Sequence, residues 1–216
     1  MRPGVYLKLL FLSALFVASL IFASTVEADV NVSRAILKNG LTVVIVRDTL
    51  APVVTTHVNY LVGSDEAPPG FPGMAHAQEH MMFRGSPGLS AEQLASIMAA
   101  MGGAFNADTQ QTVTQYTSTV PAKDLQIALN VEAVRMRGVL DTQDLWDKER
   151  GAIEQEVDQD LSNPEYLLGA RLLEKLFEET PYSYYSYWIW KVAFVGSRVS
   201  LPDSVRLVLL TVSAFH

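Results

Sequence analysis

The run His76-Ala77-Gln78-Glu79-His80 places two imidazoles four residues apart, with a carboxylate beside the second. On an α-helix each residue advances about 100°, so these three side chains project toward one small volume. Neutral imidazoles are good ligands for Zn²⁺, and a carboxylate that faces the metal without binding it can deprotonate a metal-bound water. The spacing therefore predicts metal-assisted hydrolysis, with Glu79 as the general base.

Such a site needs a third protein ligand, because zinc in hydrolases usually takes three and keeps a fourth position for water. Without that ligand, His76 and His80 are only two histidines on one turn of a helix. The other histidines of the chain are His57, in a β-rich run, and His216, the terminal residue. Both are weaker candidates than an acidic residue that faces an apolar interior.

Residues 143–161 have the period of an amphipathic helix and carry acidic residues on the apolar side. Glu149 and Glu156 fall within the apolar arc, and so does Asp160, close to the predicted helix end. Burying carboxylates costs several kcal/mol unless each meets a cation or a hydrogen-bond donor, and a metal would supply the cation. The apolar residues that define the arc are Leu145, Trp146, Ala152, Ile153 and Val157.

Together these residues resemble the pitrilysin/insulinase family of zinc metallopeptidases, in its processing-peptidase-like branch. The motif His76-x-x-Glu79-His80 has the inverzincin order, the reverse of His-Glu-x-x-His, and Glu149-x6-Glu156 follows it. The resemblance covers residues 33–182. It includes three further segments: Val62-Gly63-Ser64-Asp65-Glu66, Phe83-Arg84-Gly85-Ser86, and Gly102-Gly103-Ala104-Phe105-Asn106-Ala107-Asp108-Thr109 with Thr114 and Tyr116.

The resemblance implies a zinc endopeptidase in which His76, His80 and Glu156 hold Zn²⁺. It implies that Glu79 activates water as the general base. Glu149 would be a supporting carboxylate that orients a ligand, a role that metal sites commonly need.

The resemblance also implies that a peptide or protein substrate binds along Asn106 and Ala107. These residues would lie on an edge strand that takes the peptide by β-augmentation. Alternatively, Asn106 is a turn residue after Gly102-Gly103.

The apolar runs predict an α+β fold in which helices cover one side of an antiparallel sheet. Lys38-Asn39-Gly40 is a strong hairpin signal. The predicted strands are 34–37, 41–46, 53–62, 104–108 and 112–120. The predicted helices are the metal motif, 90–101, 122–137, 143–161 and 164–179.

The composition excludes some classes of partner and framework. The chain has 216 residues, a net charge of −7 and no cysteine. It can form no disulfide, and the lack of a basic patch argues against nucleic acid as a partner. Residues 29–216 have the length of one domain with its own core. The resemblance implies that residues 29–190 of it are the zinc metallopeptidase N-terminal domain.

The first 28 residues have the pattern of a signal peptide. Arg2 and Lys8 precede an uncharged apolar core at 9–23, and Val26-Glu27-Ala28 offers a cleavage site. We therefore expect export to the periplasm or secretion. The alternative is a retained membrane anchor, because the uncharged run 9–26 reaches the lower limit for spanning a bilayer.

The resemblance stops near Ser186, and residues 191–216 form a divergent C-terminal tail without the closing strands expected of the family. We expect this end to reflect a truncation, for example through a shifted reading frame. The chain is therefore predicted to be a zinc endopeptidase or its metal-bearing half, weak or inactive without a second half or a partner subunit. The alternative is a non-catalytic remnant or partner subunit of a two-part peptidase.

Overall fold

The computed structural model describes residues 31–48, 50–68, 71, 73–183 and 205–213. The predicted signal peptide, His216 and residues 191–204 of the predicted tail lie outside this range. The described residues all belong to one compact unit, Asn31–His216. Within them, no helix is long and apolar enough to cross a membrane.

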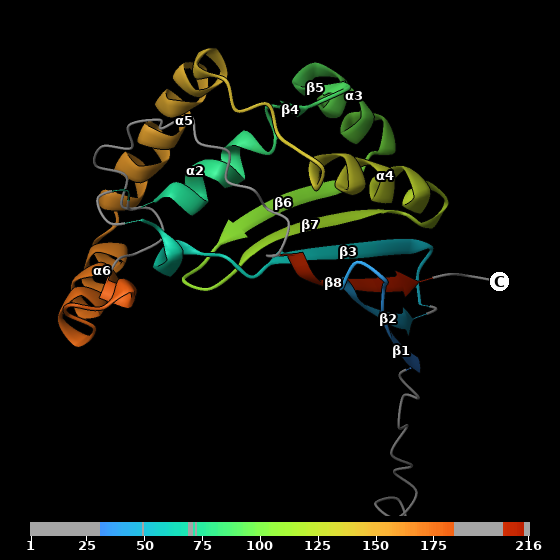
Figure 1. The fold of residues 1–216 in the computed structure, drawn as a ribbon, viewed down its shortest axis with the longest axis horizontal. Helices are drawn as coiled ribbons and strands as arrows, with labels where there is room; N and C mark the ends of the chain where they lie inside the picture. The colour runs from blue at the N-terminus through green and yellow to red at the C-terminus, as the bar shows by residue number, and fades with distance from the viewer. Residues whose placement is uncertain (1–30, 49, 69–70, 72, 184–204, 214–216) are drawn as a thin grey trace, which may run out of the picture. The chain divides into compact units, whose positions relative to one another are not determined.

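A six-stranded sheet forms one layer of this unit (Figure 1). Its strands lie in the order β1-β2-β8-β3-β7-β6, so β1 and β6 are the two edges. The bounds are β1 Asn31–Ile36, β2 Thr42–Asp48, β3 Val53–Tyr60, β6 Ala104–Thr109, β7 Thr114–Pro121 and β8 Val205–Ser213.

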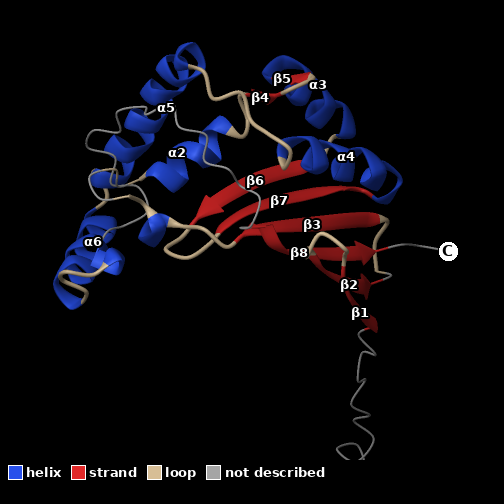
Figure 2. Cartoon of the chain, viewed as in Figure 1, coloured by secondary structure: helices blue, strands red, loops and turns tan. Residues whose placement is uncertain are grey.

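Helices form a second layer on one face of the sheet (Figure 2). Helices α2 and α4 lie against β6 and β7, and α5 packs against α2. The main helices are α2 Met74–Met81, α3 Ala91–Met101, α4 Leu125–Arg135, α5 Gln143–Leu161 and α6 Pro164–Leu176. Short elements are η1 Ser64–Glu66, η2 Ala122–Asp124, η3 Pro181–Ser183 and the β4–β5 pair, Gly85–Ser86 and Leu89–Ser90.

The covered face of β3 and β7 carries the core beneath the helices. Val58, Tyr116 and Val120 are almost completely buried, and their neighbours along each strand are more exposed. This alternation is expected where only one face of a sheet packs against helices. Tyr60 meets Tyr116 edge to face, with ring centroids 5.4 Å apart. Met82, which follows α2, packs into the same cluster and so ties the metal motif to the sheet.

The predicted α+β class, with helices covering a largely antiparallel sheet, is confirmed. Every described strand pair of the large sheet is antiparallel except β2–β8, which is parallel. The predicted helix 143–161 coincides with α5. The predicted helix 122–137 instead begins with the 3-10 turn η2 before α4, and the helix predicted at 164–179 ends at Leu176.

The expectation that residues 191–216 contain no closing strand is wrong. Val205–Ser213 forms β8, which lies between β2 and β3 in the middle of the sheet. The run is rich in valine and leucine, which suit a strand, but its partners lie far away in sequence. Pairing between segments far apart in sequence leaves no local signal. The resemblance to the family therefore did not predict this strand.

Candidate metal centre

The packing of α2 against α5 assembles the candidate site. Ala77 and Met81 lie one turn apart on α2 and form a buried cluster with Trp146 and Ile153 of α5. Residues three and four apart on a helix share a face, so this contact turns Glu149, between Trp146 and Ile153, toward α2. The same geometry turns the next acidic residue of that face, Glu156, toward the two histidines.

His76, His80 and Glu156 converge on one point. His80 Nε2 lies 3.1 Å from His76 Nε2 and 3.3 Å from Glu156 Oε2, and His76 Nε2 lies 3.5 Å from Glu156 Oε1. Tetrahedral ligands about 2.0–2.1 Å from Zn²⁺ are about 3.3 Å apart, so these donor atoms have the spacing of a zinc site. Two imidazole nitrogens and one carboxylate oxygen are also the kind of donor set that zinc hydrolases use.

Within the described residues, this trio is the only group of histidine and acidic side chains whose ligand atoms lie within 4.8 Å of one another. The alternative ligands Asp160 and His57 are not in it. His57 instead lies on β3, with Nδ1 2.9 Å from Thr117 Oγ1.

Glu149 contacts the other side of the His80 ring. Its Oε1 lies 2.9 Å from His80 Nδ1, and its second oxygen forms an ion pair with Arg84. When Nδ1–H donates to the carboxylate, the lone pair of Nε2 is left free for a metal. Glu149 is almost fully buried, whereas 42% of the Glu156 side chain is exposed. The two acidic residues of α5 thus occupy different environments at one site.

The protonation of His76 also suits a ligand. Burial, together with the neighbouring His80 imidazole, lowers the pKa of His76 to about 3. Its ring is therefore neutral at ordinary pH, and a neutral imidazole is the form that binds metals.

Glu79 lies beside the histidines, on the same helix, but its carboxylate turns to the sheet. Thr109 Oγ1 donates a hydrogen bond of 2.6 Å to Glu79 Oε2. Burial raises the pKa of Glu79 above its usual value, while the Thr109 hydrogen bond and the charge of His80 lower it in part. A partly desolvated carboxylate with a raised pKa is better suited to accept and return a proton.

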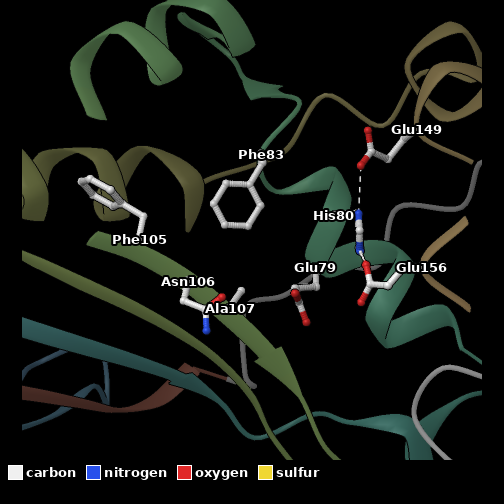
Figure 3. Close-up of a pocket in the computed structure, with 8 residues that line it drawn as sticks. All are labelled: Glu79, His80, Phe83, Phe105, Asn106, Ala107, Glu149 and Glu156. Carbon is white, nitrogen blue, oxygen red and sulfur yellow. Dashed lines mark hydrogen bonds and ion pairs between the residues drawn. The ribbon is translucent and has the colours of Figure 1, made fainter. Parts of the chain in front are cut away.

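A pocket of about 360 Å³ opens over these groups (Figure 3). Glu79, His80 and Glu156 lie at one end, and Asn106 and Ala107 of β6 face it from the sheet. The other lining residues are Phe83, Phe105 and Glu149. Carboxylate, imidazole and apolar side chains therefore line one cleft.

Asn106 and Ala107 are strand residues on an edge. Asn106 pairs with Thr117 and Ala107 with Tyr116, and β6 has no neighbour on its other side among the described strands. The alternative in which Asn106 belongs to a turn is therefore wrong. The open backbone groups of β6 are those that an added strand would pair with.

Sequence reasoning missed two residues that contact the site. Arg84 and Thr109 were noted only within family-like segments, yet one pairs with Glu149 and the other with Glu79. A threonine at a strand end carries no local signal of such a contact. Its partner follows from the way β6 packs against α2.

Proteins with similar sequences include several that are named zinc proteases. The chain is 32% identical over 155 residues to an uncharacterized zinc protease of Rickettsia bellii, a match that covers 72% of this chain and 37% of that protein. It is 32% identical over 121 residues to the zinc protease PqqE of Helicobacter pylori, covering 56% of this chain and 27% of PqqE. The chain thus spans well under half the length of these relatives.

Solved structures share the fold. A protease from Helicobacter pylori superposes with a TM-score of 0.72 at 24% identity, over 84% of this chain and 46% of that one. The inactive domain of an M16 peptidase from Pseudomonas fluorescens gives a TM-score of 0.72 at 17% identity, over 86% of this chain and 47% of that one. Pitrilysin gives 0.70 at 20% identity, over 88% of this chain and 22% of that one.

The family profile described as insulinase, peptidase family M16, matches residues 42–186. This match contains the whole of α2 and α5, and with them every residue of the candidate metal centre. The chain therefore belongs to the insulinase family of peptidases, family M16.

Proposed function

We propose that this chain is the metal-bearing part of a zinc-dependent endopeptidase. The observation that carries the proposal is the convergence of His76, His80 and Glu156, whose ligand atoms lie within 4.8 Å of one another. Glu79 lies next to this trio and is not one of its members. The zinc proteases among the relatives support the choice of metal and of peptide-bond hydrolysis.

Each residue then has a distinct task. His76, His80 and Glu156 hold Zn²⁺, which when bound supplies a Lewis acid and lowers the pKa of a water to about 7. Glu79 accepts a proton from the attacking water and returns it to the amine nitrogen that leaves. Glu149 accepts a hydrogen bond from Nδ1–H of His80, which keeps this ring in the tautomer with an unprotonated Nε2.

The edge strand β6 receives the substrate. An extended peptide adds to β6 next to Asn106 and Ala107, and main-chain hydrogen bonds align the scissile bond with the pocket. Such alignment contributes to catalysis because it converts a bimolecular encounter into an oriented one.

Metal content and cleavage measured together test the proposal. The purified chain should take up about one Zn²⁺ and slowly cleave an unstructured, quenched fluorescent peptide. Glu79→Gln should bind zinc equally well and lose the cleavage, since the substitution removes the proton acceptor and leaves the ligands intact. Cleavage that survives Glu79→Gln, or a chain that binds no zinc, contradicts the proposal.

A second candidate is a partner subunit that keeps the fold without turnover. The same fold occurs in the inactive domain of an M16 peptidase from Pseudomonas fluorescens, so the fold alone does not require turnover. Zinc uptake without any cleavage, even when a second segment of the family is supplied, would select this candidate over the first.

A further inference from the structure

The last residue of β6, Thr109, is in contact with the carboxylate assigned above as the general base. Only 1% of Thr109 is exposed, and its hydroxyl lies 2.6 Å from Glu79 Oε2. Hydroxyl-to-carboxylate hydrogen bonds of 2.5–2.7 Å are characteristic of an ionised acceptor. The contact is therefore a strong and water-excluded one.

The proton of this hydrogen bond comes from Thr109. A hydroxyl carries one proton. The neighbouring Thr114 donates its own proton to the carbonyl oxygen of Val62 over 2.9 Å. The Oγ1 atoms of Thr109 and Thr114 are 3.4 Å apart, so this contact is longer and weaker than the hydrogen bond from Thr109 to Glu79. The proton of Thr109 is thus committed to Glu79 Oε2, and Thr114 has none left to compete for that oxygen.

The backbone holds Thr109 firmly in this position. Thr109 pairs with Thr114 across the β6–β7 hairpin, and the turn is closed by a 2.8 Å hydrogen bond from Gln110 N to Val113 O. Ser64 N also donates to Gln110 O over 3.0 Å, which ties the hairpin end to the loop before α2. A donor on such a support is preorganised for the group that it contacts.

We infer that Thr109 is a positioning residue for Glu79. Its hydroxyl holds Oε2 and leaves Oε1 as the oxygen that takes the proton from water. This inference rests on the proposed function, because it names the group that orients the proposed base. It adds a role for a residue of β6 that is not one of the candidate metal ligands.

Three variants of the zinc-loaded chain test the inference. Thr109→Val keeps the shape and removes the hydroxyl, so kcat should fall about ten- to hundred-fold, as expected for the loss of one hydrogen bond to a charged group. KM and zinc affinity should stay within about two-fold, because neither ligands nor substrate contacts change. Thr109→Ser should restore most of kcat. Thr114→Val, the matched control, removes a neighbouring buried hydroxyl that does not bond Glu79, and it should have little effect on kcat.

A stability cycle on the zinc-free chain gives a readout that does not need activity. The loss of unfolding free energy caused by Thr109→Val should be smaller when Glu79 is already Met, whereas Thr114→Val should be additive with Glu79→Met. Additive effects of Thr109→Val and Glu79→Met overturn the inference, as does an unchanged kcat in Thr109→Val. If the parent chain lacks peptidase activity even when a second segment of the family is supplied, the proposed function fails while the cycle still decides the contact.

Discussion

Two glutamates on one helix have different surroundings because they lie at different depths. Glu149 is buried between the His80 ring and Arg84, whereas Glu156 reaches the same histidines from the surface side. A buried carboxylate with a cation and an imidazole donor is well suited to orient a ligand. A half-exposed one can complete a metal site and leave room for water and substrate.

Replacement of these acidic residues should separate their roles. Glu156→Gln removes the charge of the proposed third ligand and should weaken zinc binding more than Glu149→Gln, for which a loss of about 10- to 100-fold is typical of a supporting group. Asp160→Asn on the same helix is the matched control and should leave affinity unchanged. Chelator competition measures all three. Tight zinc binding by Glu156→Gln together with its loss in Asp160→Asn would show that the third ligand is Asp160.

His76 should make the zinc-free protein sensitive to acid. Its pKa falls from about 6.5 in the unfolded chain to about 3 in the folded one, because the ring is buried beside His80. Between these values the unfolded state binds a proton that the folded state does not, so stability decreases as pH falls through that window. Urea midpoints at pH 7 and pH 4, with chelator present, should therefore differ less in His76→Gln than in the parent. An equal difference in both proteins would refute this assignment.

At the scale of elements, the site depends on three contacts around α2. Helix α5 supplies the acidic residues through the cluster of Ala77, Met81, Trp146 and Ile153. The end of β6 supplies the donor for Glu79. The loop before α2 is bonded to the β6–β7 turn, which fixes the helix relative to the sheet.

The contact between that loop and the turn leaves no space for a side chain at Gly63. A Cβ there would lie 2.3 Å from the carbonyl oxygen of Gln110, so Gly63→Ala should destabilise the chain by about 1–3 kcal/mol. Gly151 lies on α5 with nothing within 4 Å of its added Cβ. Gly151→Ala is the matched control and should stabilise by about 0.5–1 kcal/mol, since glycine is a poor helix residue. Denaturant unfolding measures both, and equal effects would argue against a close approach at Gly63.

At the scale of the whole molecule, the described part carries a surface site. With 42% of its side chain exposed, Glu156 shows that water reaches the ligand group. Exclusion of water strengthens electrostatic contacts at a reacting centre, and fixed positioning of the substrate lowers the barrier further. This chain covers only part of the length of its relatives, and a second segment could supply both effects.

We therefore expect the chain alone to bind zinc but to cleave peptides slowly. Addition of a separately expressed segment, corresponding to the part of a family relative beyond its match to this chain, should raise the cleavage rate. Glu79→Gln with the same segment is the control and should stay inactive. A chain that is as fast alone as in the mixture, and that Glu79→Gln inactivates, would show that this part is sufficient.

Features that depend on neighbours along the chain could be predicted from the residues alone. The positions of His76, Glu79 and His80 on one side of a helix follow from helical periodicity, and so does the inward side of α5. The hairpin at Asn39-Gly40 and most strands could be predicted because turn chemistry and β-propensity are local.

Which distant groups meet could not be predicted in the same way. The arc of α5 left Glu149, Glu156 and Asp160 as alternatives, and the packing of Ala77 and Met81 against α5 brings Glu156 to the histidines. The contact of Thr109 with Glu79 and the place of β8 in the sheet also join segments far apart in sequence. Such contacts depend on how whole elements pack and on the register in which strands pair. Local residue preferences specify neither of these.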